Sequence, residues 1–326
     1  MTTPPPPDLA AWFDNRTFSA RDATVSQLVA HKREQGVSVS VVLPARNEAE
    51  TVEGMVAAVA ELSGSLVDEL VVMDGGSTDG TPDLAARAGA RVHADANVLP
   101  DYGPCLGKGD ALWRSLTVTS GDVVAFVDSD IKNPSPDFVV GLLTPLLLAP
   151  DVALVKAFYE RPLQTEGQLQ PSGGGRVTEL LARPLLNLLW PPLGGLIQPL
   201  SGEYAGRRDL LEAIPFFTGY GVELGMLVDT LEAVGIDAIA QVDVGERIHH
   251  NQPLDALSRM AYAISQVAFL RLDAEARLSL SGVFGADGAP PGRYVQFARS
   301  DDGQMRPETR DVTVVQRPPI TSVATR

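Results

Sequence analysis

Strand-like apolar runs alternate with helical stretches in the first half of this chain, and this alternation narrows the choice of fold more than any other feature. Residues 37–43 are a β-branched apolar run, and residues 52–62 then place apolar side chains at helical spacing. Further strand-like runs follow at residues 70–73, 122–127 and 152–158. Alternation of this kind predicts an α/β fold, in which helices flank a mostly parallel sheet.

The pattern changes after residue 160, where helical stretches predominate. We expect a helix at residues 177–190, a strand at 238–244 and a long helix at 254–272 with one apolar packing face. The apolar stretch 180–200 contains one arginine and four prolines, so it predicts a buried helix and loop and no membrane span.

These changes divide the chain into four segments. After residue 282 the sequence is rich in Gly, Pro, Asp and Arg, so we expect this part to run over the surface or to a partner subunit. The expected segments are a lead-in (1–36), a first α/β half (37–160), a more helical second half (161–285) and a C-terminal tail (286–326).

The composition excludes several classes of protein. The 326 residues carry a formal net charge of −15, which argues against nucleic acid as a partner, because binding phosphates needs a surplus of Lys and Arg. Cys105 is the one cysteine in the sequence, which excludes an intrachain disulfide and a cysteine-rich zinc site. The proline-rich N-terminus does not have the pattern of a secretory signal, so we expect a cytoplasmic protein.

The sharpest chemical signal is Asp128-Ser129-Asp130, which directly follows the strand-like run 122–127. Open α/β sheets bind ligands at the carboxyl ends of their strands. Two carboxylates at positions i and i+2 of a turning backbone can share a hard divalent cation and a ribose hydroxyl. A solvated acidic turn is the alternative, but the position after a buried strand favours a ligand site.

Polar segments also follow the first two strands. Residues 44–48 (Pro-Ala-Arg-Asn-Glu) lie where a nucleotide base and ribose would bind, and Glu48 could hold them. The same residues could simply begin a helix, with Asn47 as its cap. Residues 74–79 contain two glycines that would let a ligand approach the backbone, and Asp74 could face the base, although a plain turn also explains them.

Two glycine-flanked cations are suited to anions. Lys108 lies between Gly107 and Gly109 at an expected helix start, where a point charge and backbone N–H groups could meet a diphosphate. This is not a Walker motif, because Gly109 stands where Ser or Thr is required. Arg176 follows Gly175 before the next expected helix and offers a second anion site, with a flexible linker as the alternative.

Two adjacent histidines, His249 and His250, follow the expected strand 238–244. One imidazole could complete the metal site that Asp130 begins, although histidines in a polar loop are an equal alternative. A Gly-x-Ser-x-Gly motif, and a Gly-x-Gly-x-x-Gly motif after the first strand, are both absent from the sequence. Serine-hydrolase and dehydrogenase chemistry are therefore not supported.

Taken together, these motifs resemble a known family. Four of them resemble, in this order, the donor half of GT-A glycosyltransferases: residues 41–48, 74–81, 107–109 and 128–130. Four more extend the similarity, over about residues 12–285, to the actinobacterial glucosyl-3-phosphoglycerate synthases: residues 175–178, 201–206, 219–223 and 249–251. The resemblance implies a Rossmann-like GT-A fold, with 37–160 as the nucleotide-sugar donor half and 161–285 as the acceptor-binding half.

The resemblance implies a retaining transferase that moves glucose from UDP-glucose to 3-phosphoglycerate, the first step toward methylglucose lipopolysaccharide or glucosylglycerate. It implies Mg²⁺ (or Mn²⁺) as cofactor and a homodimer, for which the apolar face of helix 254–272 could serve. By position, the nucleotide sugar would be bound by Pro44, Ala45, Arg46, Glu48, Gly75, Lys108, Asp128 and Ser129. The acceptor would be bound by Gly175, Arg176, Thr178 and Asn251.

The resemblance also implies metal and catalytic roles. Asp130 and His249 would bind the metal, and Asp130, Lys108 and Glu223 would be the catalytic residues. Glu223 would position the acceptor or the departing sugar. It would not act as a nucleophile, because retention in this family is usually explained by attack on the same face, assisted by the leaving diphosphate.

The chain also departs from the family pattern. Arg46 stands where the family often has Leu, and Gly75 replaces a serine that contacts the nucleotide. The preference for UDP over GDP therefore stays open. Two alternatives remain: a mannosyl-3-phosphoglycerate synthase that uses GDP-mannose, and a non-catalytic nucleotide-sugar sensor on the same scaffold.

Overall fold

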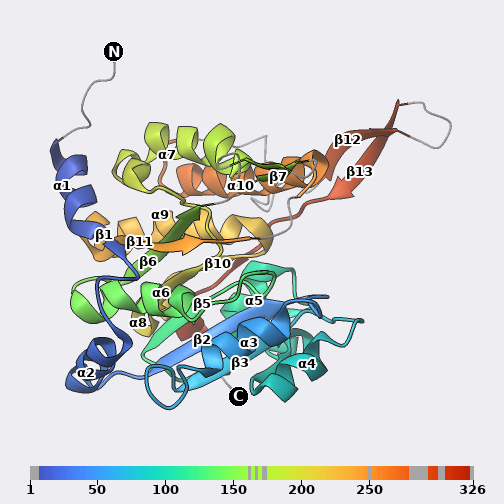
Figure 1. Cartoon of the computed structure of the whole chain (residues 1–326). Coiled ribbons are helices and arrows are strands. Elements are labelled where there is room, and N and C mark those ends of the chain that lie inside the picture. Colours follow the sequence, from blue (N-terminus) through green and yellow to red (C-terminus); the bar gives the residue numbers. More distant parts are fainter. Residues whose placement is uncertain are drawn as a thin grey trace.

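An eight-stranded sheet lies between layers of helices in the computed structural model (Figure 1). The structure describes residues 7–160, 163–165, 168–170, 175–248, 252–278, 293–299 and 305–323. The sheet consists of β1 (Thr17–Ser19), β2 (Val39–Ala45), β3 (Glu69–Asp74), β4 (Arg91–Ala94), β5 (Val123–Phe126), β6 (Leu154–Glu160), β9 (Tyr204–Arg207) and β11 (Ile239–Glu246). Their order is β1-β11-β6-β9-β5-β2-β3-β4, with β9 antiparallel to both neighbours and the other pairs parallel. The predicted α/β fold with a mostly parallel sheet is confirmed.

Two hydrophobic cores fill the space on either side of the sheet, because successive strand side chains point to opposite faces. Val41 and Leu43 of β2 join one core, whereas Val42 between them joins the other. The first core is covered by α2 (Val25–Gln35), α3 (Val52–Ala60), α4 (Thr81–Ala88) and α6 (Asp137–Leu148). The second is covered by α1 (Pro7–Arg16), α5 (Lys108–Ser115), α7 (Arg183–Leu189), α8 (Arg208–Ala213), α9 (Val222–Val234) and α10 (Leu254–Ala274).

Shorter elements connect these layers. The short strands are β7 (Leu163–Thr165), β8 (Gln168–Gln170), β10 (Phe216–Phe217), β12 (Arg293–Arg299), β13 (Met305–Asp311) and β14 (Gln316–Arg317). The short helical turns are η1 (Asp95–Asn97), η2 (Pro100–Tyr102), η3 (Thr178–Ala182), η4 (Pro191–Gly195), η5 (Gly219–Gly221), η6 (Ile236–Ala238) and η7 (Ile320–Ser322).

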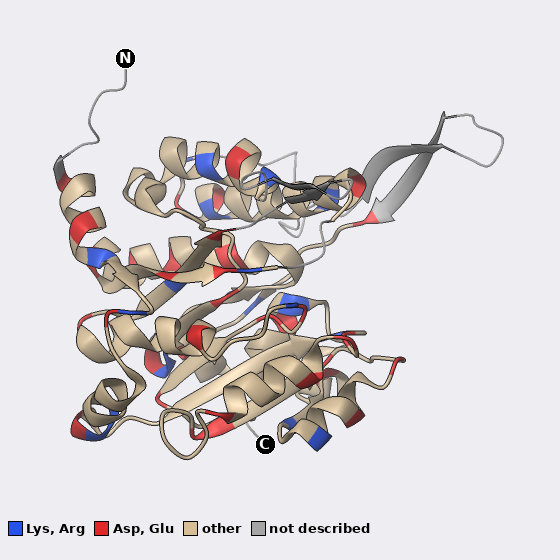
Figure 2. Cartoon of the chain, viewed as in Figure 1, with Lys and Arg blue, Asp and Glu red and all other residues tan. Residues whose placement is uncertain are grey.

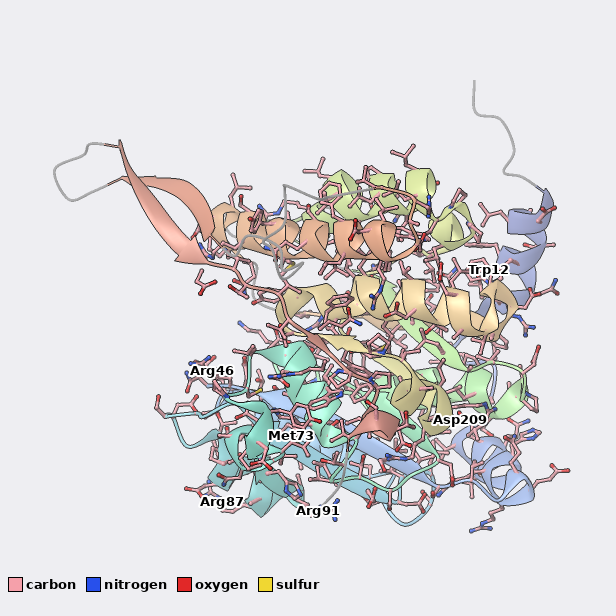
Figure 3. All side chains as sticks on the ribbon, turned by 180° about the vertical axis from the view of Figure 1, so that it is seen from behind. Trp12, Arg46, Met73, Arg87, Arg91 and Asp209 are labelled. Atoms are coloured by element: carbon pink, nitrogen blue, oxygen red, sulfur yellow. The ribbon has the colours of Figure 1, made fainter. Side chains whose placement is uncertain are left out.

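The N-terminal lead-in adds a strand to the eight-stranded sheet and a buried side chain to the second core. β1 pairs in parallel with β11. Trp12 of α1 is buried, and its Nε1 donates to the carbonyl oxygens of Ile236 and Ile239 at 3.1 and 3.0 Å. Figure 3 shows Trp12 beside the end of α9. The lead-in therefore fastens the outer edge of the sheet to the second helical layer.

The first strand extends two residues further than the sequence predicted. We expected it to stop at Pro44, but Pro44 and Ala45 still pair with Met73 and Asp74 of β3. The carbonyl oxygen of Pro44 accepts from Ser129 on the β5 side, where β5 has already ended. The N–H group that proline lacks would point to that same side, so no ladder hydrogen bond is lost.

The helix expected at residues 177–190 is divided into η3, a π-helical turn, and α7. Pro184 has no N–H to donate, so the regular helical bond pattern is interrupted at this point. Leu180 and Leu188 are 81% and 76% exposed, so the expectation that this apolar stretch is buried is wrong for these two side chains. No helix in the described part of the chain is long and apolar enough to cross a membrane.

The apolar face of α10 is used within the chain. Ala263, Ile264 and Val267 are buried in the second core, next to η5 and α9. The idea that this face could serve a dimer is therefore wrong for these residues.

The C-terminal residues 312–323 return to the body of the protein after the β12–β13 hairpin, which extends away from it (Figure 1). β14 pairs antiparallel with β10, and Val314, Arg317 and Ile320 are buried. Our expectation that the tail runs over the surface is wrong for this segment. Its apolar residues are too few and too irregularly spaced to show a helix or strand period.

Candidate active site

A cavity of about 630 Å³ opens at the carboxyl ends of β2, β3 and β5, where α/β sheets bind ligands. It brings together residues that are far apart in the sequence. The predicted site residues that line it are Pro44, Ala45, Arg46, Glu48, Gly75, Lys108, Asp128, Asp130, Gly175, Arg176, Thr178 and Glu223. The motifs assigned to the donor and those assigned to the acceptor therefore face one space.

The remaining predicted site residues are Ser129, His249 and Asn251. Ser129 is buried behind the lining, and its hydroxyl donates to the carbonyl oxygen of Pro44 at 2.7 Å. This bond ties the loop after β5 to the end of β2, and a direct contact of Ser129 with the nucleotide sugar stays a prediction. His249 and Asn251 lie outside the described residues.

Asp128 is the centre of the charged network in the cavity. Its Oδ1 lies 2.5 Å from Lys108 Nζ, which is also 3.3 Å from Glu223 Oε1. Burial alone would raise the pKa of Asp128, but Lys108 and then Arg247 hold this pKa well below its usual range. Burial would likewise lower the pKa of Lys108, but Asp128 and Glu223 hold it well above its usual range. Both groups are therefore charged.

Arg247 closes the network from the strand side of the cavity. Its Nη2 lies 2.5 Å from Asp130 Oδ1 and 3.1 Å from Asp128 Oδ2. Its Nη1 lies 3.2 Å from Glu203 Oε1 and donates to the Tyr159 hydroxyl, which donates to Glu203 Oε2 at 2.6 Å. The largely buried guanidinium thus fixes the orientation of the Asp128 and Asp130 carboxylates.

The two carboxylates of the Asp-Ser-Asp motif are suited to a shared cation. They already share one Arg247 nitrogen, and the side chain of Asp130 is 34% exposed toward the cavity. Oxygen ligands of this kind are those that Mg²⁺ and Mn²⁺ prefer. Across the described residues, no three His, Cys, Asp or Glu side chains come together as a complete ligand set. Ligand, solvent or His249 would have to supply the rest.

Lys108 and Glu223 are each placed by the start of a helix. Lys108 is the first residue of α5, after Gly107 with φ +88°, and Glu223 lies in the first turn of α9. A Cβ atom added to Gly109 would lie 1.9 Å from the carbonyl oxygen of Phe217. Only glycine fits there, so the start of α5 is in tight contact with β10, which leads into α9.

Glu48 has an altered acidity. Burial, and then repulsion by Asp130, raises its pKa to about 7. Because this pKa lies above the usual 4.5, the folded protein binds the proton more tightly than the unfolded chain. The contribution of Glu48 to stability therefore falls as the pH rises from about 4.5 to about 7.

Three of the predicted acceptor residues, Gly175, Arg176 and Thr178, line the cavity at the start of η3. Arg176 is exposed, and its Nη2 donates to the carbonyl oxygen of Gln252 at 2.8 Å. Gly175 has φ +80°, and the buried Thr178 begins η3. Leu257 and Met260 of α10 add apolar surface to the lining of the cavity. Arg176 therefore lines the cavity with a guanidinium that is held by one hydrogen bond to the Gln252 backbone.

The cavity is lined by charges of both signs. Acidic residues occur on the helices of both layers (Figure 2), in keeping with the formal net charge of −15. Four cations nevertheless line the cavity: Arg46, Lys108, Arg176 and Arg247. Figure 3 shows Arg46 further out than Met73 of β3, so Arg46 marks the rim. Five carboxylates line it as well: Glu48, Asp95, Asp128, Asp130 and Glu223. Lys108 and Arg247 are paired with three of them, so an anionic ligand would meet charges of both signs.

The cavity lining includes residues that the sequence did not predict for the site. Arg247 and Tyr220 line the cavity, and each lay within a motif that was singled out for a neighbouring residue. Met260 lies on the apolar face of α10, which was assigned to packing or to a dimer contact. Gly202 approaches Asp128 so closely that an added Cβ would lie 2.1 Å from Asp128 Oδ2. No local signal marks that contact, because 74 positions separate the two residues.

Comparisons with known proteins agree with this geometry. The family model named "Glycosyl transferase family 2" matches residues 40–208. A glucosyl-3-phosphoglycerate synthase of Mycolicibacterium smegmatis is 47% identical over 97% of this chain and 99% of its own length.

Solved structures extend the comparison. A mannosyl-3-phosphoglycerate synthase of Rubrobacter xylanophilus superposes with a TM-score of 0.88 at 40% identity, covering 98% of this chain and 99% of that one. A glucosyl-3-phosphoglycerate synthase of Mycobacterium tuberculosis superposes with a TM-score of 0.79 at 44% identity, covering 94% and 98%. That structure contains Mn²⁺, UDP-glucose and phosphoglyceric acid, and another of the same protein contains Mg²⁺ and UDP.

Proposed function

The chain belongs to the glucosyl-3-phosphoglycerate synthases of glycosyl transferase family 2, and we propose that its cavity transfers glucose from UDP-glucose to 3-phosphoglycerate. The product is glucosyl-3-phosphoglycerate. The observation that carries this proposal is that the donor motifs around Asp128 and the acceptor motif around Arg176 line one cavity. Transfer between two bound substrates requires this proximity.

On the donor side, Pro44, Ala45 and Glu48 bind the base and ribose, and Gly75 lets the nucleotide approach the backbone. Asp128 orients Lys108, whose ammonium group meets the diphosphate. Negative charge grows on this diphosphate as the sugar departs, so a preorganised cation stabilises the transition state more than the ground state.

Mg²⁺ or Mn²⁺ is the cofactor, and Asp130 and His249 are its proposed ligands. When bound, the ion supplies positive charge that neutralises the diphosphate. Asp130 is suited to this because it faces the cavity from the end of β5, next to Asp128. Arg247 holds both carboxylates from behind and fixes their orientation.

On the acceptor side, Arg176, with Gly175, Thr178 and Asn251, binds the phosphate of 3-phosphoglycerate. Glu223 positions the acceptor hydroxyl or the departing sugar, and its ion pair with Lys108 links both sides of the cavity. We propose that the transfer retains the configuration of the sugar, because the acceptor attacks the face that the diphosphate leaves. We also propose that the protein acts in the cytoplasm as a homodimer. Its reaction would be the first step toward methylglucose lipopolysaccharide or glucosylglycerate.

The function is tested by incubating the protein with UDP-glucose, 3-phosphoglycerate and Mg²⁺ and identifying the product by mass spectrometry and NMR. We expect the α-linked glucoside, its loss in EDTA, and little product when glycerate replaces 3-phosphoglycerate. Equal turnover of glycerate would contradict the proposed phosphate site. Full activity in EDTA would contradict the metal requirement.

Arg176→Ala is expected to raise the KM for 3-phosphoglycerate about 10- to 100-fold, because a hydrogen bond to a charged group contributes about 1.5–3 kcal/mol. Affinity for UDP should change less than about twofold, because the donor residues are untouched. Steady-state kinetics and calorimetry measure the two effects. Arg87→Ala, at the exposed end of α4, is the matched control. An acceptor KM like that of the wild type would contradict the assignment.

Glu48 gives a pH prediction. Its carboxylate form accepts hydrogen bonds from the base and ribose more strongly than its protonated form does. With a pKa of about 7, the ionised fraction of Glu48 rises about tenfold between pH 6 and 8. UDP affinity, measured by NMR titration without added metal, should rise with pH accordingly. Glu48→Gln should retain only the smaller change due to ionisation of UDP itself. The same pH dependence in both proteins would rule out this role of Glu48.

A second candidate is transfer of mannose from GDP-mannose. The observation that favours it is the TM-score of 0.88 with the mannosyl-3-phosphoglycerate synthase, against 0.79 for the glucosyl enzyme. Identity points the other way, with 40% to the former and 44% to the latter. Donor choice depends on contacts with single hydroxyl and base groups, which overall superposition does not measure.

A further inference from the structure

The C-terminal residues 312–323 contact the element that leads to Glu223. β14 pairs with β10 through Phe216 and Arg317. The N–H of Thr218 donates to the carbonyl oxygen of Val315, and the Val315 N–H donates to the hydroxyl of Thr218, each at 3.0 Å. β10 continues through η5 into α9, so the tail borders the backbone that places Glu223.

The same tail reaches the helix that begins with Lys108. Arg317 donates from Nε to Asp110 Oδ1 at 3.0 Å and from Nη2 to Asp110 Oδ2 at 2.6 Å. Asp110 is fully buried two residues after Lys108, and its Oδ2 also accepts from the N–H of Leu106 at 2.9 Å. A two-bond arginine–carboxylate pair fixes angle as well as distance. Arg317 therefore fixes the turn that presents Lys108.

A second arginine holds Asp110 from the opposite side. Arg114, fully buried, places its Nε 3.2 Å from Asp110 Oδ1 and donates from Nη2 to the carbonyl oxygen of Gly103 at 2.8 Å. Arg114 would remain if Arg317 were changed, so Asp110 would stay paired. What would be lost is the link between this turn and the C-terminal tail.

The two catalytic helix starts are also in direct contact. Gly109 faces the carbonyl oxygen of Phe217, and a Cβ added to Gly107 would lie 3.5 Å from the Cα of Gly219. A shift of β10 would therefore displace the start of α5, and a shift of the start of α5 would displace β10. The tail contacts both elements at this point, since Arg317 bonds Asp110 while β14 pairs with β10.

We propose that Arg317 is a positioning residue for the transfer reaction, which sets Lys108 against the donor diphosphate and Glu223 beside it by joining β14 to Asp110. This inference rests on the proposed function, because it assumes that Lys108 meets the diphosphate. It gives the C-terminal tail a role in the active site although the described residues of the tail do not line the cavity.

The test is Arg317→Lys, which keeps the positive charge but cannot form the two-bond pair. Displacements of about 1 Å at a reacting group can cost about 100-fold in rate. We expect kcat to fall at least about tenfold and the KM for UDP-glucose to rise. The KM for 3-phosphoglycerate should stay within about twofold, because Arg176 belongs to a separate element.

Ile320→Ala is the matched control, because Ile320 is buried in the same tail but lies in η7 beside α8, away from Asp110. Both variants are assayed well below their Tm. A tail that only stabilises the fold would give both variants the same kinetics at equal Tm, and this result would overturn the inference. If Arg317→Lys does not fold, Arg317→Gln, which leaves the Arg114–Asp110 pair intact, replaces it with the same expectation.

Calorimetric binding of UDP with Mg²⁺ separates this inference from the proposed function. If the wild type binds UDP but does not use UDP-glucose, the proposed function fails. The comparison of UDP binding between the two variants then tests the role of Arg317. Weaker UDP binding in Arg317→Lys than in Ile320→Ala would support the inference, and equal binding would overturn it. A wild type that does not bind UDP would overturn both.

Discussion

Asp130→Asn is expected to abolish metal-dependent transfer, lowering kcat/KM at least about 1000-fold, or about 4 kcal/mol of transition-state stabilisation. The amide keeps the size of the side chain but loses the charge that binds a hard cation. The fold should persist, because the Asp130 side chain is 34% exposed and Arg247 retains its contacts with Asp128 and Glu203.

Three measurements test this expectation: turnover with saturating Mg²⁺, Mn²⁺ affinity by electron paramagnetic resonance, and Tm. Asp83→Asn, an exposed carboxylate in the first turn of α4, is the matched control and should retain activity. Loss of activity with unchanged metal affinity would remove Asp130 from the metal site. Turnover like that of the wild type would remove it from the mechanism altogether.

Gly202→Ala is expected to lower kcat about 100-fold and to raise the KM for UDP-glucose. The added Cβ would lie 2.1 Å from Asp128 Oδ2 and 2.6 Å from Lys108 Nζ, so the ion pair must move. Both side chains are 20% exposed and can move toward the cavity, so the strain falls on the site more than on the fold. Displacing a charged group by about 1 Å from its position at the reacting atoms can lower the rate about 100-fold.

Gly194→Ala is the matched glycine control, because the atom that its Cβ would meet, Asn187 Oδ1 at 2.8 Å, ends a side chain that can rotate away. We expect near-normal kinetics for this control and a small decrease in Tm. Normal kinetics in Gly202→Ala would mean that the 2.5 Å contact between Lys108 and Asp128 is not needed for transfer.

The parts of the fold and site that the sequence predicts are those with local signals. β5 is a continuous apolar run, and β2, β3 and β6 are mostly apolar, so the burial of these strands is largely visible in the sequence. Asp128, Asp130 and Glu48 follow such runs directly, and topology then brings strand ends together at one edge. Lys108 is marked by the glycines on either side of it.

The parts that the sequence does not predict depend on contacts between distant residues. Arg247 meets Asp128 and Asp130 across more than 100 positions, and nothing near Arg247 shows which charges it will face. β9 is only four residues long, and its antiparallel insertion between β5 and β6 depends on its neighbours. Arg317 lies 207 positions from Asp110, in a tail with no periodic pattern. Composition described that tail correctly as polar, but not where it packs.

The most direct test of the central claim is a competition in one reaction, with equal concentrations of UDP-glucose and GDP-mannose, limiting enzyme, 3-phosphoglycerate and Mg²⁺. Product ratios from mass spectrometry after nucleotide removal report the ratio of the two kcat/KM values directly. The account predicts that glucosyl-3-phosphoglycerate exceeds the mannosyl product by at least about tenfold, a difference of about 1.4 kcal/mol. A majority of mannosyl product would contradict it and would assign the cavity to GDP-mannose.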